Sequence, residues 1–282
     1  MELLNQLTKD KVMQIRKMYR RLGGLRPFAI FLFACLAVAP ATAGTLDDVK
    51  QRGELVVGVK TDFPPFGSVD SSGKNVGFDV DLAHAFAEAL FGDESKVQFV
   101  SVTSGNRIPF LQSNKIDIIM ASMTITDERA EVVDFSEPYF LSGSLLMTPA
   151  DSTIQGVEDL ADKTVAVIQG SVQDSIVAEL APEAERVKFG KVSEAVLAIK
   201  TGRADAYVHD DIVILTLAEE NPDLKPVGKP FEPLPYGIAV RKGDTDFINW
   251  VDEQLKTMKE DESFDELWSK HFGDIEQNLV KP

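Results

Sequence analysis

Short apolar runs alternate with amphipathic stretches along most of the chain. This alternation predicts an α/β protein with mostly parallel sheets. The first series predicts strands at 54–60, 97–102 and 116–121 and helices at 79–91 and 108–112. After Pro149 a second series predicts strands at 164–168, 187–189 and 204–208 and helices at 171–180, 192–201 and 211–219. Two such series predict two sheets, and therefore two lobes.

The last part of the chain continues the same pattern. Residues 236–241 are strand-like, residues 244–259 form an amphipathic helix, and a final helix ends at Gly273. In open α/β sheets ligands bind beyond the carboxyl ends of the strands. The residues that directly follow each predicted strand are therefore the candidates for a binding site.

The N-terminal stretch resembles a removable export signal. Basic residues precede an apolar run at 28–39, and small residues at Ala41 and Ala43 fit a cleavage site after Ala43. We therefore expect residues 1–43 to be a signal peptide and the mature protein to be periplasmic. An uncleaved membrane anchor and lipid attachment at Cys35 are the alternatives, and Met13 or Met18 are alternative starts.

Charge and cysteine content narrow the possible functions. The formal net charge is −16, and the predicted signal is basic, so the remaining chain is more acidic still. Such a balance argues against binding nucleic acid or anionic membranes, which require cationic surfaces. Cys35 is the single cysteine, so removal of the signal leaves neither a disulfide nor a thiolate metal site. No cofactor is expected.

The segment after the first strand combines a cation, two prolines and an aromatic ring. Lys60 is followed by Pro64 and Pro65, which stiffen the loop, and then by Phe66. A stiff loop could present Phe66 as a flat wall for a ligand. The alternative is an ordinary core phenylalanine, because aromatic side chains are usually buried.

Hydroxyl residues and an arginine follow the strand at 116–121. Ser122 and Thr124 alternate in an extended segment and can face one ligand. Thr126 fits the N-cap of a short helix, and Arg129 could clamp a carboxylate with two hydrogen bonds. The alternative is a capped turn with a surface arginine.

Further polar residues follow the other strands. Arg107 precedes a short helix, Gln169 and Ser171 flank the start of another, and Asp210 follows the strand at 204–208. Asp210 could accept a ligand ammonium, cap the next helix, or do both. His209 beside it makes no metal site, since the histidines are far apart in sequence. Neither a catalytic nucleophile motif nor a nucleotide-binding motif occurs.

Taken together, these segments resemble family 3 of the extracellular solute-binding proteins, the receptors of polar amino-acid ABC importers. The resemblance extends over nearly the whole chain after the signal. It rests on GFDVDLA at 77–83, MTITDER at 123–129, FSEPY at 135–139, GRADA at 202–206 and YGIA at 236–239.

The resemblance implies a two-lobed periplasmic-binding-protein fold with a ligand between the lobes. Residues 44–141 and 238–282 would form one lobe and 142–237 the other, with hinge crossovers near 142–146 and 234–238. Ser122, Thr124 and Arg129 resemble the α-carboxylate site, and Asp210 resembles the ammonium acceptor. Phe66 resembles the stacking wall, while Gln169 and Ser171 resemble contacts made on closure.

The segment TSGNRIP at 103–109 resembles glutamate- and aspartate-binding members, in which its arginine holds the side-chain carboxylate. Lys60 lies where that subgroup can carry another cation. We therefore expect a glutamate or aspartate receptor. Because Lys60 is not an arginine, and because His209 beside Asp210 resembles glutamine receptors, glutamine or another polar amino acid remains the alternative. A membrane permease is the expected partner, and a monomer the expected state.

Two other classes remain open. A lyase similar to cyclohexadienyl dehydratase shares this architecture, and Asp62, His209 or Asp210 could act as acid or base. A sensor domain is the third class, but the sequence contains neither an effector domain nor a later hydrophobic segment of spanning length. We expect a binding protein rather than an enzyme.

Overall fold

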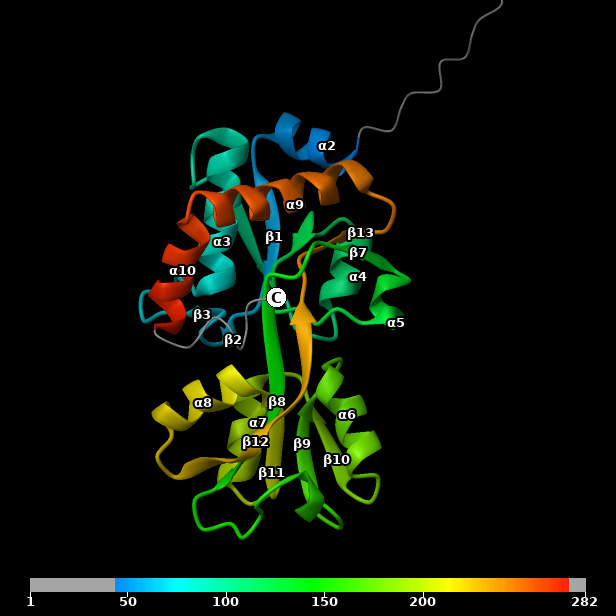
Figure 1. Cartoon of the computed structure of the whole chain (residues 1–282), viewed down its shortest axis with the longest axis vertical. Helices are drawn as coiled ribbons and strands as arrows, with labels where there is room; N and C mark the ends of the chain where they lie inside the picture. Colours follow the sequence, from blue (N-terminus) through cyan, green and yellow to red (C-terminus); the bar gives the residue numbers. More distant parts are fainter. Residues whose placement is uncertain (1–43, 274–282) are drawn as a thin grey trace, which may run out of the picture. The chain divides into compact units, whose positions relative to one another are not determined.

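The computed structural model describes residues 44–273, which fold around two five-stranded sheets flanked by helices (Figure 1). The predicted signal peptide, its cleavage site after Ala43 and Cys35 lie outside the described residues. Within residues 44–273, no helix has the length and apolar character needed to cross a membrane.

The first lobe is built on a sheet with the strand order β5-β1-β6-β13-β7. Strands β1, β5 and β6 are parallel, and β13 is antiparallel to its neighbours. All elements predicted for the first series are present. The strands are β1 (Leu55–Val59), β5 (Val97–Ser101), β6 (Ile118–Ile119), β7 (Val133–Phe135) and β13 (Ala239–Arg241). The helices are α2 (Thr45–Arg52), α3 (Phe78–Phe91), α4 (Arg107–Gln112), α5 (Asp127–Ala130), α9 (Thr245–Glu260) and α10 (Ser263–Phe272).

The second lobe is built on a sheet with the order β10-β9-β11-β8-β12. Its strands β9, β10 and β11 are parallel, whereas β8 is antiparallel to both neighbours. The strands are β8 (Phe140–Pro149), β9 (Thr164–Ile168), β10 (Glu185–Phe189), β11 (Ala206–Asp210) and β12 (Leu224–Tyr236). The helices are η1 (Val157–Asp159), α6 (Val172–Leu180), α7 (Val192–Lys200) and α8 (Asp211–Glu220). The two separate sheets confirm the predicted two-lobed α/β fold.

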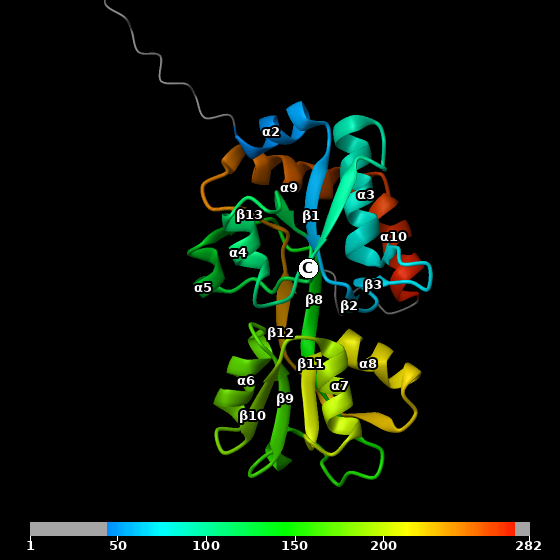
Figure 2. The same cartoon turned by 180° about the vertical axis from the view of Figure 1, so that it is seen from behind.

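Strands β8 and β12 run between the two lobes (Figure 2). At one end of the pair, Phe140 lies opposite Tyr236, and Tyr236 also bridges to Thr124 in the first lobe. At the other end, Pro149 lies opposite Leu224 in the second sheet. The lobes are therefore linked by a two-stranded antiparallel ribbon.

Strand β12 departs from the sequence prediction. A strand was expected at 236–241, but β12 ends at Tyr236 and β13 begins at Ala239. Strand β12 also contains four prolines, which argue against a strand in sequence analysis. It tolerates them because it lies at the edge of its sheet and carries two register shifts, so the missing N–H donors break few ladder bonds.

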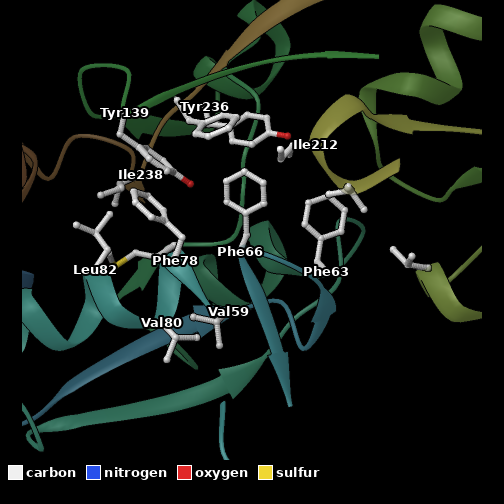
Figure 3. Close-up of a cluster of buried hydrophobic side chains, with 14 of the residues drawn as sticks. Val59, Phe63, Phe66, Phe78, Val80, Leu82, Tyr139, Ile212, Tyr236 and Ile238 are labelled. Carbon is white, nitrogen blue, oxygen red and sulfur yellow. The ribbon is translucent and has the colours of Figure 1, made fainter. Parts of the chain in front are cut away.

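A small sheet of β2 (Asp62–Phe63), β3 (Gly67–Val69) and β4 (Asn75–Val76) follows β1. It delivers Phe66 into an aromatic cluster with Phe78, Phe140 and Tyr236, part of which is drawn in Figure 3. These rings are almost completely buried. The cluster joins α3 to the ends of β8 and β12 and so anchors the ribbon in the first lobe.

Candidate ligand-binding site

Most of the predicted site residues lie at the carboxyl ends of parallel strands. Lys60 follows β1, Ser122 and Thr124 follow β6, Gln169 and Ser171 follow β9, and Asp210 is the last residue of β11. Arg107 begins α4, and Arg129 lies in α5.

The strand ends of the two lobes face each other across the cleft. Arg129 Nη2 in the first lobe donates to the carbonyl oxygen of Gly170 in the second, at 2.9 Å. The Val192 N–H at the start of α7 donates to Asp62 Oδ2 in the first lobe, at 2.9 Å. The lobes are therefore in contact at two polar points in this conformation. Gly170 has a φ of +80°, and a Cβ there would lie 2.8 Å from the Gly105 Cα, so a larger residue would disturb the contact.

Two spaces lie between the lobes. An inner cavity of about 10 Å³ is lined from one side by Lys60 and Phe63 and from the other by His209. It has room for about one water molecule. An outer groove of about 630 Å³ is bordered by Arg129 and Ser171. The inner polar groups are thus accessible to an amino acid only when the lobes separate.

Arg129 is tied to the segment that carries the hydroxyl residues. Its Nη1 donates to the carbonyl oxygen of Thr124 at 2.7 Å, and its own N–H donates to the Thr126 side chain at 3.3 Å. The predicted Thr126 N-cap is thus confirmed. Burial lowers the pKa of Arg129, and the nearby charge of Asp210 opposes that shift. Arg129 remains a cation that faces both lobes.

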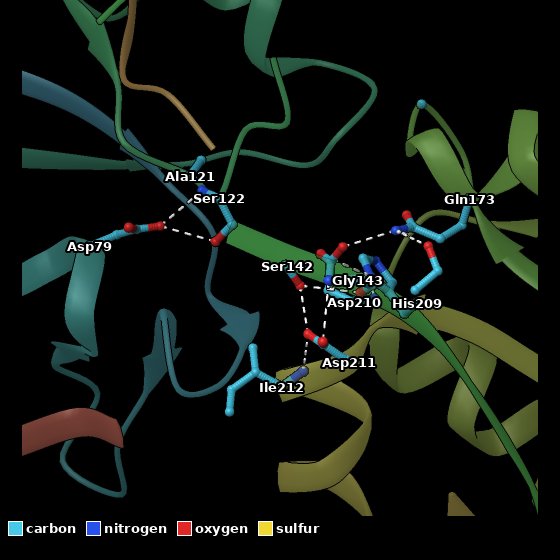
Figure 4. A network of polar contacts seen from close by, with 12 residues as sticks. Asp79, Ala121, Ser122, Ser142, Gly143, Gln173, His209, Asp210, Asp211 and Ile212 are labelled. Carbon is cyan, nitrogen blue, oxygen red and sulfur yellow. Dashed lines mark hydrogen bonds and ion pairs between the residues drawn. The ribbon is translucent and has the colours of Figure 1, made fainter. Parts of the chain in front are cut away.

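Asp210 is held by a glutamine that sequence analysis did not single out. Gln173 Nε2 donates to Asp210 Oδ1 at 2.8 Å, and both residues are buried (Figure 4). Asp210 occupies the N-cap position of α8, but its side chain does not cap the helix. Although burial opposes ionisation, His209 and Lys60 bring the pKa of Asp210 below its ordinary value. Asp210 is therefore a buried carboxylate suited to an ammonium group.

Phe63, not Phe66, is the aromatic residue at the polar cluster. The Lys60 Nζ lies 3.3 Å from the centre of the Phe63 ring, and this ring also meets His209 edge-on at 4.8 Å. Phe66 packs among other aromatic rings, so the structure places it in the core, as the alternative expected, rather than beside the polar cluster. The reason is tertiary packing, because the Phe66 ring meets Phe78, Phe140 and Tyr236 from distant segments.

Lys60 and Arg107 are buried cations that lie near one another. Burial, together with the charge of Arg107, lowers the pKa of Lys60 to about 7. Burial, together with the charge of Arg129, lowers the pKa of Arg107 to about 9. Nearby carboxylates, including Asp210, oppose both shifts.

Gln169 and Ser171 differ in their surroundings. The Gln169 side chain is exposed, so the structure does not bring it into the polar cluster. Gln173, the second residue of α6, occupies the interior instead. Ser171 is the N-cap of α6, and its Oγ is buried without a hydrogen-bond partner among the described residues. Over the same residues, no cluster of three or more metal-binding side chains occurs.

The sequence of residues 55–274 matches the family described as bacterial extracellular solute-binding proteins, family 3. The ABC transporter glutamine-binding protein GlnH of Bacillus subtilis (strain 168) is 42% identical over 228 residues, which cover 80% of this chain and 84% of that protein. The glutamate/aspartate import solute-binding protein of Escherichia coli (strain K12) is 30% identical over 248 residues, with 83% and 82% covered. The solved solute receptor for L-cysteine of Neisseria gonorrhoeae aligns with a TM-score of 0.81 at 33% identity, and covers 85% of this chain and 100% of that structure.

Proposed function

The chain belongs to the bacterial extracellular solute-binding proteins, family 3, and from this premise we propose that it is the receptor of an ABC importer for a polar amino acid. One observation carries the proposal. Arg129 in the first lobe, which is half-buried, and Asp210 in the second, which is buried, are opposite charges that act on each other across the cleft. An α-amino acid offers one carboxylate and one ammonium, and these complement that pair.

The receptor works by closure of the lobes over the ligand. The amino acid docks on Ser122, Thr124 and Arg129 in the open form, and Asp210 and Ser171 then engage it. The ribbon of β8 and β12 supports hinges at the predicted crossovers, 142–146 and 234–238, with 44–141 plus 238–282 and 142–237 as the two lobes. The closed form is what a membrane permease would recognise.

The site of action follows from the family. Its members are described as extracellular, which supports an exported protein acting outside the cytoplasmic membrane. The signal peptide over 1–43 and its cleavage after Ala43 stay predictions. The relatives are named as binding and transport proteins, which supports a receptor rather than a lyase.

Glutamine is the ligand that the observations favour. The relative named as glutamine-binding is 42% identical, against 30% for the one named as a glutamate/aspartate protein. Carboxylates already face the cations of the site before any ligand enters. The cations are Lys60, Arg107 and Arg129, and the carboxylates around them are Asp62, Asp79, Glu128 and Asp210. A zwitterion with a neutral side chain adds no net charge to this buried cluster.

Glutamate or aspartate, the ligand expected from the sequence, is the second candidate. Lys60 favours it, because a buried ammonium group in the inner cavity could pair with a side-chain carboxylate. Calorimetric titration of residues 44–282, refolded to remove bound ligand, against glutamine, glutamate, aspartate, arginine and leucine tests both. Glutamine is expected to bind at micromolar concentration or below. If none of these amino acids binds, the receptor proposal fails, and turnover of prephenate becomes the next assay.

The pH dependence of binding separates the two ligands. Lys60, with a pKa of about 7, is mostly neutral above neutral pH, and a ligand carboxylate beside it would raise that pKa. Glutamate binding would then take up a proton, and its affinity would fall by up to about tenfold per pH unit above pH 7. Glutamine affinity should stay nearly flat, because its amide places no charge beside Lys60.

Titrations between about pH 7 and 8, in two buffers of different ionisation enthalpy, measure this proton uptake below the pKa of about 9 that burial and Arg129 give Arg107. His209, whose pKa burial lowers, and Asp79, with a pKa of about 6, do not change charge above neutral pH. The Lys60→Met variant is the control, in which glutamate binding should lose its pH dependence. Tighter binding of glutamate than of glutamine, with proton uptake, would move the assignment to the second candidate.

A further inference from the structure

The peptide group between Ala121 and Ser122 lies between two buried side chains of opposite charge. On one side, Arg107 Nη1 donates to the Ala121 carbonyl oxygen at 2.7 Å. On the other, the Ser122 N–H donates to Asp79 Oδ2 at 2.9 Å, and the Ser122 Oγ donates to the same oxygen at 3.1 Å (Figure 4). Arg107 and Asp79 are each exposed by 2% or less, so water does not replace these bonds.

Neither charge forms an ion pair within the described residues. Asp79 Oδ1 accepts a hydrogen bond from the Tyr139 hydroxyl at 2.9 Å. Besides its bond to Ala121, Arg107 Nη1 donates a longer hydrogen bond to the Ser122 carbonyl oxygen, at 3.4 Å. Burial raises the pKa of Asp79 to about 6. An unpaired buried charge is costly unless hydrogen bonds compensate it. Here the backbone of residues 121–122 provides that compensation for Asp79 and for Arg107 Nη1, while Arg107 Nε is buried without a hydrogen-bond partner among the described residues.

Arg107 stands where helix electrostatics alone would not place a cation. It is the first residue of α4, and the positive end of a helix dipole disfavours positive charge there. Asp79, by contrast, lies in the first turn of α3, where a negative charge is favoured. Contact with the carbonyl oxygens of 121 and 122 explains why the arginine is held at this position.

Ser122 itself has a backbone conformation that needs support. Its φ is +48°, in the left-handed region that non-glycine residues rarely adopt. Such a conformation costs free energy and persists where surrounding contacts determine it. The bonds from Asp79 and Arg107 are made to this residue and to the peptide group preceding it.

We propose that Asp79 and Arg107 act together as positioning residues that hold the 121–122 peptide group, and with it the ligand-binding segment that follows. From Ser122 the chain runs to Thr124, whose carbonyl oxygen accepts Arg129 Nη1. A rotation of the 121–122 peptide would therefore be passed on to Thr124 and Arg129. This inference rests on the proposed function. It replaces the expected role of Arg107 as the partner of a ligand side chain.

The selectivity of an Arg107→Met variant tests this role. Loss of positioning should weaken glutamine, glutamate, aspartate and asparagine by the same factor, about 10- to 100-fold, and leave the ratio of their Kd values unchanged within about twofold. A direct contact would instead weaken the dicarboxylates alone. A selective loss for glutamate and aspartate therefore overturns the inference.

Arg241→Met is the matched control. Arg241 Nη1 also donates to two backbone carbonyl oxygens in the first lobe, those of Leu111 at 3.0 Å and Ile116 at 2.9 Å, away from the cleft. It should lower thermal stability but leave every Kd unchanged. If Arg107→Met does not fold, Arg107→Lys serves instead, since one ammonium can still reach the Ala121 carbonyl. It should give a smaller loss that is again equal for all ligands.

The joint action of the two residues is tested by combining Arg107→Met with Asp79→Asn. Because both act on one peptide group, the double variant should lose much less affinity than the product of the two single losses. If the loss of affinity in the double variant equals the product of the two single losses, the joint role is overturned.

The amide resonance of Ser122 reports on the peptide without any ligand. It should titrate with Asp79 near pH 6 and shift in Arg107→Met, although Arg107 contacts the opposite side of the peptide. An unshifted resonance overturns the inference. If the wild-type protein binds no amino acid, the proposed function fails, and this measurement still decides the role of the two residues.

Discussion

Replacing Arg129 with methionine is expected to weaken the binding of every amino acid by a factor of about 10²–10⁴. The change would remove the two charge-assisted hydrogen bonds that we propose Arg129 donates to the ligand carboxylate, and would leave that carboxylate in the cleft without this partner. Breaking a buried pair in this way costs about 3–5 kcal/mol. It also removes the contact of Arg129 with Gly170, which joins the lobes in the closed conformation. Calorimetric titration with glutamine and glutamate measures the loss.

Two variants separate these contributions. Arg129→Lys keeps the charge but loses the planar fork, so an intermediate loss is expected. Arg186→Met is the matched control, because Arg186 forms a partly exposed ion pair with Asp174 in the second lobe. It should leave affinity unchanged. Binding by Arg129→Met as tight as that of the wild type would exclude Arg129 as the carboxylate site.

The second large effect is expected for Asp210→Asn, which should weaken amino-acid binding by a factor of about 10²–10³. The substitution preserves shape, and the asparagine oxygen can still accept the Gln173 hydrogen bond that Asp210 Oδ1 accepts. What disappears is the negative charge that we propose lies opposite the ligand ammonium. Titration with glutamine gives the size of the loss.

A ligand without the ammonium group tests whether the missing negative charge causes the loss of affinity in Asp210→Asn. Glutaramate, which is glutamine without its α-amino group, should bind weakly to the wild type and no more weakly to Asp210→Asn. Asp205→Asn is the control, since Asp205 accepts the Thr164 N–H at the start of β9, the end of that strand away from the cleft. A further loss of glutaramate binding in Asp210→Asn would show that the substitution damages the lobe itself.

The two phenylalanines after β1 show where local pattern stops being informative. Both follow the same strand in a proline-stiffened loop, and nothing in their sequence context separates a ring at the cleft from a ring in the core. Packing decides between them, because Phe66 meets aromatic residues from β8, β12 and α10, all distant in sequence. Phe63 is left facing Lys60 and His209.

Gln173 and Arg107 show the same limit for polar residues. Gln173 is one polar residue on an amphipathic helix, and only the approach of β11 makes it the partner of Asp210. Arg107 belongs to the motif at 103–109, which predicts a ligand contact. In the structure, however, its guanidinium donates to the carbonyl oxygen of Ala121, 14 residues away in the sequence. The role of such a side chain depends on partners that local sequence does not specify.

The sequence by itself determined the α/β class, the two series of elements, the Thr126 cap and the placement of polar residues after strands. These features depend on periodicity, capping and strand ends, which are local properties of the chain. The tertiary structure alone decided the path of the proline-rich β12, the exchange of Phe66 for Phe63, and the contacts of Arg129 and Asp62 with the opposite lobe. These features arise where segments far apart in sequence meet, so their energies come from packing, burial and charge between lobes rather than from any local pattern.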